Sequence, residues 1–312
     1  MSDKGDLSQK AEAMIAGLAV GDALGVPVEF LQRDTFVVTD MVEMPDAAYP
    51  VGTWSDDTSL TLALADNLNP EKFDLHPIAE AFVAWYDRAR YTPCGVTFGV
   101  GDSTQRAIQK MRDAVALDRV GGTTERDNGN GSLMRIAPLA IYLADVGDVE
   151  KRFEIVKAVS SLTHAHEWSV AACMIFTEML RKLISGQDKE IAYSDLRQEF
   201  TSTKLISAET LTKYRRILTE DIRTFSRDEI SSTGFVVDTL EAAFWCFLTT
   251  DNYKSAVLQA VNLGFDADTI GAVTGAMSGL YYGKEAIPSA WLKRIIGLDE
   301  IEFIAYKLSP MQ

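Results

Sequence analysis

Glycine recurs at every fourth position in two apolar segments near opposite ends of the chain, and these positions are Gly17, Gly21, Gly25, Gly271, Gly275 and Gly279. Residues four apart lie on one face of a helix, so each segment would present a strip of uncovered backbone. Glycine inside a helix costs about 0.5–1 kcal/mol relative to alanine. Three in a row are therefore expected only where another helix approaches closely, and we predict that these two helices pack together in one core.

The pattern of apolar residues elsewhere indicates an all-α fold, because they recur at three- and four-residue spacing and the alternation typical of half-buried strands is scarce. We predict helices over residues 9–24, 55–68, 76–89, 103–117, 132–144, 149–162, 167–184, 233–249, 252–261 and 268–282. A short extended piece is expected at 36–38. No linker rich in Pro, Gly or Ser divides the chain, so we expect a flexible tail at 1–10 and one domain at 11–312, with a charged helical insertion at 185–232.

Composition and charge exclude several classes of partner. A net charge of −15 disfavours nucleic acid, since no concentrated basic stripe offsets it. A membrane-spanning role for the glycine-rich segments fails because Asp266 and Asp268 interrupt the second apolar run well short of the roughly 20 residues that spanning needs. The three cysteines are far apart and suggest neither a zinc site nor a disulfide framework. Together with a polar start lacking a secretory apolar run, they lead us to expect a cytoplasmic protein.

Two Asp-rich segments stand at predicted helix starts. Residues 55–58 read Ser-Asp-Asp-Thr before an apolar run, and Asp266, Asp268 and Thr269 open the second glycine-rich helix. Each segment alone is explained as a helix cap, with acids favourable at a helix amino terminus. Together, four carboxylates would repel one another and raise each other's pKa values unless cations neutralised them. Magnesium or manganese suits such oxygen ligands better than zinc, so we hypothesise a two-metal site.

Three further features carry weaker signals. Residues 128–135 place glycines and the donors Asn130 and Ser132 at a helix start, where the backbone could cradle a diphosphate; a tight turn with a helix cap is an equal alternative. The segment is neither a Walker A loop nor a dinucleotide fingerprint. His164 near a helix start is more often a capping or packing residue than a catalyst. Glu29, after a helix end with a proline, would alone read as a surface acid.

Five blocks, taken in order, resemble the ADP-ribosylglycohydrolase family: GDALGVPVE (21–29), WSDDT (54–58), GNGSLMR (129–135), LTH (162–164) and NLGFDADTIG (262–271). The resemblance runs from about residue 11 to residue 291. It implies an orthogonal multi-helix bundle with a central cleft for two Mg²⁺ ions, Mn²⁺ being an alternative. It also implies hydrolysis of the glycosidic bond that joins ribose C1″ of ADP-ribose to a protein side chain.

The resemblance implies roles for individual residues. By position, the metal ligands would be Ser55, Asp56, Asp57, Asp266, Asp268 and Thr269. The substrate-binding residues would be Gly129, Asn130, Gly131, Ser132 and His164. Glu29 matches a glutamate near the catalytic centre, and we expect either Asp56 or Asp57 to deprotonate the attacking water while Glu29 positions the substrate.

Three positions depart from the family pattern. Phe265 and Ala267 stand where many relatives have Gly and Thr, and Gly99 occupies a place that is acidic in some members, which leaves the general base less certain. The sequence of residues 262–269 resembles that of the bacterial dinitrogenase reductase-activating glycohydrolase-like branch, which acts on ADP-ribosyl-arginine. We therefore predict a metal-dependent hydrolase of ADP-ribosylated protein, with arginine as the acceptor.

Two other functions remain as alternatives. The first is an immunity or inhibitor protein that binds an ADP-ribosylating toxin or its modified target, with or without hydrolysis. The second is a diphosphate enzyme of the terpenoid synthase type, but that class needs an Asp-Asp-x-x-Asp array and Leu60 stands at the last of those positions.

Overall fold

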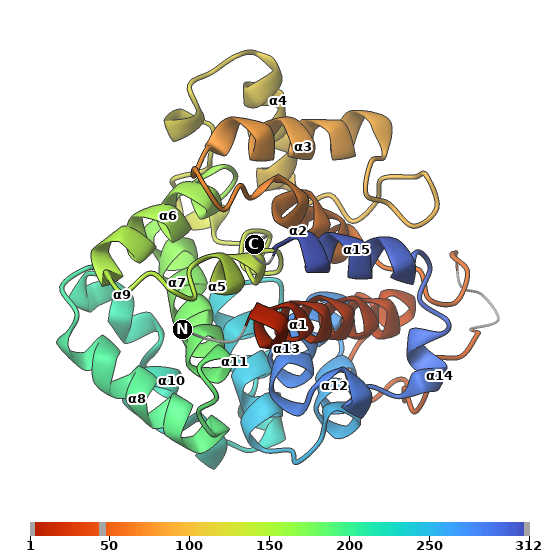
Figure 1. Ribbon diagram of the computed structural model, residues 1–312. Coiled ribbons are helices and arrows are strands. Elements are labelled where there is room, and N and C mark those ends of the chain that lie inside the picture. Colours follow the sequence, from red (N-terminus) through yellow and green to blue (C-terminus); the bar gives the residue numbers. More distant parts are fainter. Residues whose placement is uncertain (1–3, 44–47, 309–312) are drawn as a thin grey trace.

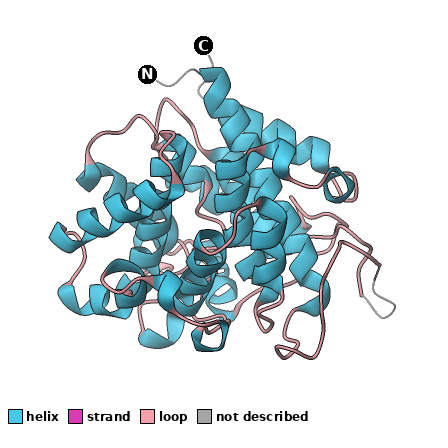
Figure 2. Cartoon of the chain, turned by 90° about the horizontal axis from the view of Figure 1, so that it is seen from below, coloured by secondary structure: helices cyan, strands magenta, loops and turns pink. Residues whose placement is uncertain are grey.

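The computed structural model describes residues 4–43 and 48–308, and within these residues every named secondary-structure element is a helix (Figures 1 and 2). The α-helices are α1 Lys4–Gly25, α2 Asp56–Asn67, α3 Leu75–Arg88, α4 Asp102–Arg112, α5 Pro138–Tyr142, α6 Val149–Ser161, α7 Glu167–Ile184, α8 Lys189–Ser202, α9 Ala208–Lys213, α10 Arg215–Leu218, α11 Val236–Leu248, α12 Tyr253–Val261, α13 Ala267–Tyr282, α14 Ser289–Leu292 and α15 Leu298–Leu308. Short 3-10 helices are η1 Val26–Val28, η2 Leu117–Arg119, η3 Glu125–Asp127, η4 Ile222–Thr224, η5 Arg227–Glu229 and η6 Lys284–Ala286.

Helices α1 and α13 pack along their length, as the glycine spacing predicts (Figure 1). A methyl group added at Gly17 would lie 2.5 Å from the carbonyl oxygen of Gly275, and one added at Gly21 would overlap the carbonyl oxygen of Gly271. The backbones therefore approach to a distance that no larger residue permits at these positions. This contact joins the amino-terminal helix to a helix near the other end of the chain.

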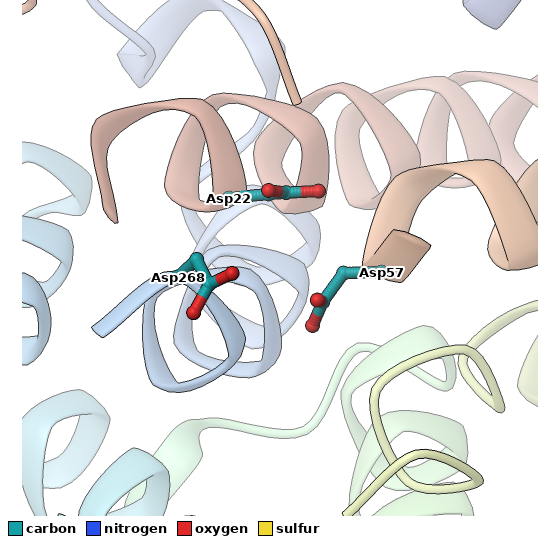
Figure 3. Close-up of side chains that lie close together, drawn as sticks. All are labelled: Asp22, Asp57 and Asp268. Atoms are coloured by element: carbon teal, nitrogen blue, oxygen red, sulfur yellow. The ribbon is translucent and has the colours of Figure 1, made fainter. Parts of the chain in front are cut away.

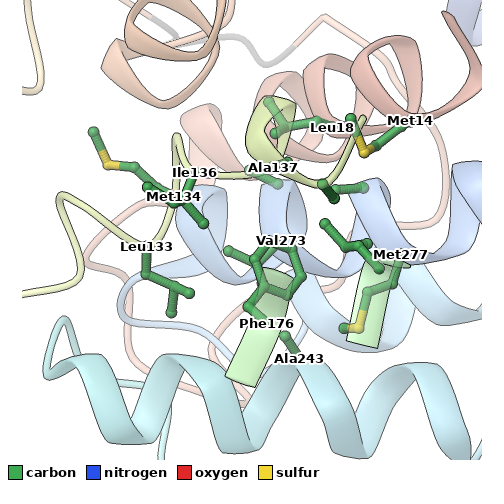
Figure 4. Packing of buried hydrophobic residues seen from close by; sticks show 14 of the residues in the cluster. Met14, Leu18, Leu133, Met134, Ile136, Ala137, Phe176, Ala243, Val273 and Met277 are labelled. Carbon is green, nitrogen blue, oxygen red and sulfur yellow. The ribbon is translucent and has the colours of Figure 1, made fainter. Parts of the chain in front are cut away.

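A continuous apolar core surrounds this helix pair. Figure 4 shows Met14 and Leu18 of α1 facing Val273 and Met277 of α13, with Phe176 of α7 below them. Helix α11 closes the far side of the core, and α15 packs on α1 and α2. Buried apolar residues from Leu7 to Leu308 belong to this one cluster.

The amino-terminal segment differs from the predicted flexible tail. Helix α1 begins at Lys4, so most of residues 1–10 are helical, and Leu7 is buried in the core. Residues 1–3 lie outside the described residues. By length and composition residues 6–28 could cross a membrane, but 83% of the most apolar 18-residue stretch of this segment is buried inside the protein, as in a core helix.

The predicted helices at 55–68, 76–89, 149–162, 167–184, 252–261 and 268–282 are confirmed to within one residue at each end. The helix expected at 132–144 begins only at Pro138, because turns occupy residues 131–135. Residues 36–38 form no strand, and two isolated bridges are the only β pairing among the described residues. Segment 185–232 is helical as expected, and it buries an apolar face of its own that includes Tyr193 and Phe200.

Candidate active site

The starts of α2 and α13 meet in one polar centre. Figure 3 shows Asp57 of α2, Asp268 of α13 and Asp22 of α1 projecting from three helices toward a common space. One carboxylate oxygen from each of these residues lies within 4.8 Å of the others. The structure thus brings together the two Asp-rich helix starts that the sequence analysis paired.

Asp22 is a site residue that the sequence analysis missed. Its carboxylate accepts hydrogen bonds from the backbone N–H of Ser55 (2.9 Å) and from the N–H and hydroxyl of Thr58 (3.0 and 2.6 Å). Asp22 is fully buried, and it ties the first turn of α2 to the last turn of the glycine-rich helix α1. A charged residue within an otherwise apolar, glycine-striped helix was the available signal, because a buried carboxylate needs partners.

The helix-cap interpretation of residue 55 holds in the structure. Ser55 is the N-cap of α2; its hydroxyl accepts from the N–H of Asp57 (3.2 Å) and donates to the carboxylate of the same residue (2.9 Å). Asp266 takes the N-cap position of α13 but makes no cap hydrogen bond. Instead, the side-chain amide of Asn130 donates to both Asp266 and the hydroxyl of Thr239.

A second carboxylate group lies beside the first. Oxygens of Glu29, Asp266 and Asp268 lie within 4.8 Å of one another, so Asp268 belongs to both groups. Glu29 follows the short helix η1, which begins with Val26 and Pro27 and turns the chain back toward α13. The next residue, Phe30, donates its backbone N–H to the carbonyl of Phe265 (2.6 Å), and this hydrogen bond holds the two segments together.

The crowding of acids perturbs their ionisation. Burial, and after it the neighbouring carboxylates, raises the pKa of Asp56, Asp57 and Asp268 well above the usual range. Burial also raises the pKa of Asp22 to about 6, and burial with the charge of Asp266 raises the pKa of Glu29 to about 7. Without a positive charge nearby, burial and mutual repulsion disfavour the ionised form of these acids.

The arrangement fits a hard divalent cation. Oδ1 of Asp57 and Oδ1 of Asp268 are buried and have no hydrogen-bond partner among the described residues, and a buried carboxylate oxygen left in this state is costly. Mg²⁺ and Mn²⁺ bind clustered carboxylate and hydroxyl oxygens of this kind. The described residues therefore include an acidic cluster that could hold metal.

Asp56 belongs to neither of these two carboxylate groups, and its side chain lies beside Gly99. The backbone at Gly99 has φ +76°, and a side chain there would overlap Oδ1 of Asp56. An acidic residue at position 99 would therefore displace Asp56 from its place in this chain.

A cavity of about 310 Å³ opens over the centre. Its lining includes an acidic wall, made of Glu29, Asp56, Asp57, Asp266, Asp268 and Thr269, and a glycine wall, made of Gly129, Asn130, Gly131 and His164. Two predicted residues do not line it: Ser55, which caps α2, and Ser132. The hydroxyl of Ser132 is buried against Ser160 (3.0 Å) and Cys173 (3.5 Å), so Ser132 could reach a ligand only through its backbone.

His164 is packed against the glycine wall. A methyl group at Gly131 would lie 2.9 Å from the His164 ring, so the ring needs glycine at this position. Burial, and after it the guanidinium of Arg135, lowers the pKa of His164 to about 3. The ring is therefore neutral at physiological pH and can offer a hydrogen bond without a charge.

Residues 3–311 match the model of the ADP-ribosylglycohydrolase family. The chain belongs to that family. It is similar to ADP-ribosylarginine hydrolase Tri1 of Serratia proteamaculans, with 34% identity over 97% of this chain and 79% of the relative. It is also similar to ADP-ribosyl-[dinitrogen reductase] glycohydrolase of Rhodospirillum rubrum, with 32% identity over 92% of this chain and 90% of the relative.

A solved structure described as an ADP-ribosylglycohydrolase-related protein complex superposes with a TM-score of 0.81 at 30% identity, covering 98% of each chain. The predicted all-α ADP-ribosylglycohydrolase fold is thereby confirmed. Family membership also confirms that the chain is a glycosidase, and its relatives agree with the predicted arginine-directed branch. The carboxylate-lined cavity lies where residues of all five sequence blocks converge.

Proposed function

We propose that this family member hydrolyses the bond between ribose C1″ and the guanidinium of ADP-ribosylated arginine on a protein, using two Mg²⁺ or Mn²⁺ ions. One observation carries the proposal: Asp268 is shared by two carboxylate groups on one wall of a cavity whose other wall is built from glycines and a neutral histidine. The relatives named for ADP-ribosylarginine and for ADP-ribosylated dinitrogen reductase support arginine as the acceptor.

The residues that would hold the two ions are Ser55, Asp56, Asp57, Asp266, Asp268 and Thr269. Bound ions would neutralise the carboxylates and polarise the ribose hydroxyls. Asn130 of the glycine wall keeps Asp266 in place through its side-chain hydrogen bond. Asp22 would act behind the ligands by holding the first turn of α2.

The chain's own groups account for the remaining tasks. Cleavage develops positive charge at C1″, and carboxylate oxygens of the acidic wall that the ions leave unbound would stabilise this charge electrostatically. We assign deprotonation of the attacking water to Asp56 or Asp57, both of which line the cavity. Glu29 stands at the edge of the same wall and would position the substrate. The glycine wall, with the backbone of Ser132 and the ring of His164, would bind the diphosphate and ribose.

The test is a panel of proteins and peptides ADP-ribosylated on arginine, serine or other acceptors, incubated with Mg²⁺, with Mn²⁺ or with EDTA. Chromatography of free ADP-ribose should show release from arginine only, loss of release in EDTA, and recovery when the metal is restored. Tight binding without release from any acceptor would replace this proposal with the alternative of a toxin-binding or target-binding immunity protein.

The number of ions needs a separate measurement. Calorimetric titration of the metal-free protein should give a stoichiometry of two, and D268N should reduce binding at both positions because this residue serves both groups. A stoichiometry of one would leave the hydrolase proposal standing and overturn the two-ion site.

We also infer a cytoplasmic location, since all three cysteines are free.

A further inference from the structure

Arg135 is a fully buried cation that the proposed chemistry does not use directly. Among the described residues, its guanidinium has no carboxylate partner within ion-pair distance. It donates instead to three neutral oxygens, those of Gly131, Thr163 and Val159, and it stacks over the ring of Phe82 at 4.8 Å. Burial lowers the pKa of Arg135 to about 10, so it stays charged at neutral pH. Burying a charge without an ion-pair partner costs free energy, so the hydrogen bonds of Arg135 are expected to serve a specific role.

The bonds of Arg135 reach two elements of the cavity wall. Its Nη1 holds the carbonyl of Gly131 in the glycine wall, and its Nη2 donates to the hydroxyl of Thr163 at 2.8 Å. The same hydroxyl lies 2.8 Å from Nδ1 of His164. One buried guanidinium therefore connects the glycine wall with the histidine that packs against it.

The direction of these bonds follows from the inventory of donors. A guanidinium can only donate, so the Thr163 oxygen accepts from Arg135. Within the described part of the chain, Arg135 and His164 are the two partners of this hydroxyl. Its single proton thus has one acceptor available, Nδ1 of His164, because a buried O–H left without an acceptor would be penalised.

We infer that Arg135 and Thr163 hold His164 in the neutral tautomer that carries its proton on Nε2. Nε2 lies on the cavity side of the ring, 3.7 Å from the place of a methyl group at Gly129. The tautomer therefore presents an N–H donor to the ligand space. That this donor meets an oxygen of ADP-ribose rests on the proposed function, whereas the tautomer itself does not. Arg135 and Thr163 are positioning residues in this arrangement.

The charged groups around His164 agree with a ring that stays neutral. Apart from burial, Arg135 and Arg106 lower the pKa of His164, and Asp127 opposes them. Asp127 is engaged elsewhere, by Arg106 and by the backbone N–H of Thr124 (3.0 Å).

The inference can be tested by ¹⁵N NMR of the imidazole rings, because the chain has three histidines, His76, His164 and His166. In the wild-type protein, the His164 signals should report a proton on Nε2 and an unprotonated Nδ1, without titration between about pH 5 and 8. A proton on Nδ1, or a doubly protonated ring at neutral pH, would overturn the inference whether or not the protein hydrolyses anything.

Variants then test the role of the threonine. T163V removes the hydroxyl and should allow both tautomers, whereas T163S keeps the hydroxyl and should retain the Nε2 proton. T177V is the matched control, because Thr177 is also fully buried and its hydroxyl has no partner. Unchanged His76 and His166 signals would show that each variant is folded. A pure Nε2 tautomer in T163V would contradict the role given to Thr163.

Binding provides the second readout. ADP-ribose, used as the probe in calorimetry, should bind T163V about tenfold more weakly, and T163S and T177V within about twofold of the wild type. Equal affinity in T163V despite a changed tautomer would overturn the contact between Nε2 and the ligand. Failure of the hydrolase proposal would show itself differently, as an absence of ADP-ribose release by the wild-type protein.

Discussion

Thr269, in the first turn of α13, donates a hydrogen bond of 3.4 Å to Asp57, in the first turn of α2, across 212 residues of sequence. The bond joins the two helix starts directly, and Oδ1 of Asp57 has no hydrogen-bond partner in the part of the chain that the structure describes. Asp57 is thus held by hydroxyls on one side, Ser55 and Thr269, and free on the other. Such a residue serves function at the expense of the stability of the metal-free protein.

We expect D57N to separate these two effects. Hydrolysis should fall by at least about 100-fold, since a charged ligand and candidate base is lost. The metal-free protein should be no less stable than wild type, because the raised pKa of Asp57 means that its charge opposes folding. Initial rates at saturating Mg²⁺ and thermal unfolding in EDTA measure the two quantities. D148N is the control, because Asp148 caps α6 at the surface and Asn caps equally well. Full turnover in D57N would remove Asp57 from the mechanism.

Unlike D57N, D22A should lower the free energy of unfolding of the metal-free protein. The substitution leaves the N–H of Ser55 and both donors of Thr58 unpaired in the interior, which should cost about 2–4 kcal/mol of unfolding free energy. Urea unfolding gives the value. D6A provides the comparison on the same helix, because Asp6 pairs with Lys10 near the surface and should contribute less than about 1 kcal/mol. Equal stability of D22A and D6A would show that Asp22 does not hold α2.

The metal-free protein should lose stability as the pH rises from about 6.5 to 8. The pKa of Glu29 is about 7 in the folded protein against an ordinary 4.5, so the folded state binds more protons in this range and the free energy of unfolding falls. His164 acts in the opposite sense, but its effect ends near its ordinary pKa of 6.5. Thermal unfolding in EDTA should show a smaller fall in E29Q, and Mg²⁺ should flatten the profile. If the stability in EDTA did not change with pH, the raised pKa of Glu29 in the metal-free protein would be contradicted.

Substitutions in the loop at 95–101 should distinguish backbone strain from contact with Asp56. Gly95 and Gly99 both have positive φ, +69° and +76°, so alanine at either position should cost roughly 1–2 kcal/mol of stability. Only at Gly99 would the new methyl group meet Asp56, since nothing lies within 4 Å of that position at Gly95. We therefore expect hydrolysis to fall about tenfold or more in G99A and to change little in G95A. Equal activities would show that Asp56 tolerates displacement.

The parts of the fold that sequence predicts are those with a local pattern. Glycine at every fourth residue anticipated the contact of α1 with α13, and the apolar spacing anticipated α7 to the residue. The start of α5 was wrong because Arg135 holds the carbonyl of Gly131 in a turn, and that contact depends on the fold around it. Helix α15 was not predicted, and it lies beyond the last recognisable motif.

The same distinction applies to the site. Asp57 and Asp268 were predictable because each stands in a compact acidic motif at a helix start. The role of Asp22 was not, since its partners are 33 and 36 residues away and belong to another helix. Nor could the sequence show that the hydroxyl of Ser132 faces Ser160 rather than the cavity. Side-chain direction is set by packing, and no spacing rule records it.

The glycine contact between α1 and α13 also has a consequence for biosynthesis. Gly21 and Gly271 are 250 residues apart, so at typical translation rates the ribosome needs roughly 12–50 s to supply the second partner after the first. Throughout that interval the bare face of the nascent α1 is uncovered and half of the acidic centre is missing. The growing chain is therefore inactive until α13 has been synthesised, and the uncovered apolar face of α1 is a natural target for chaperones during that interval.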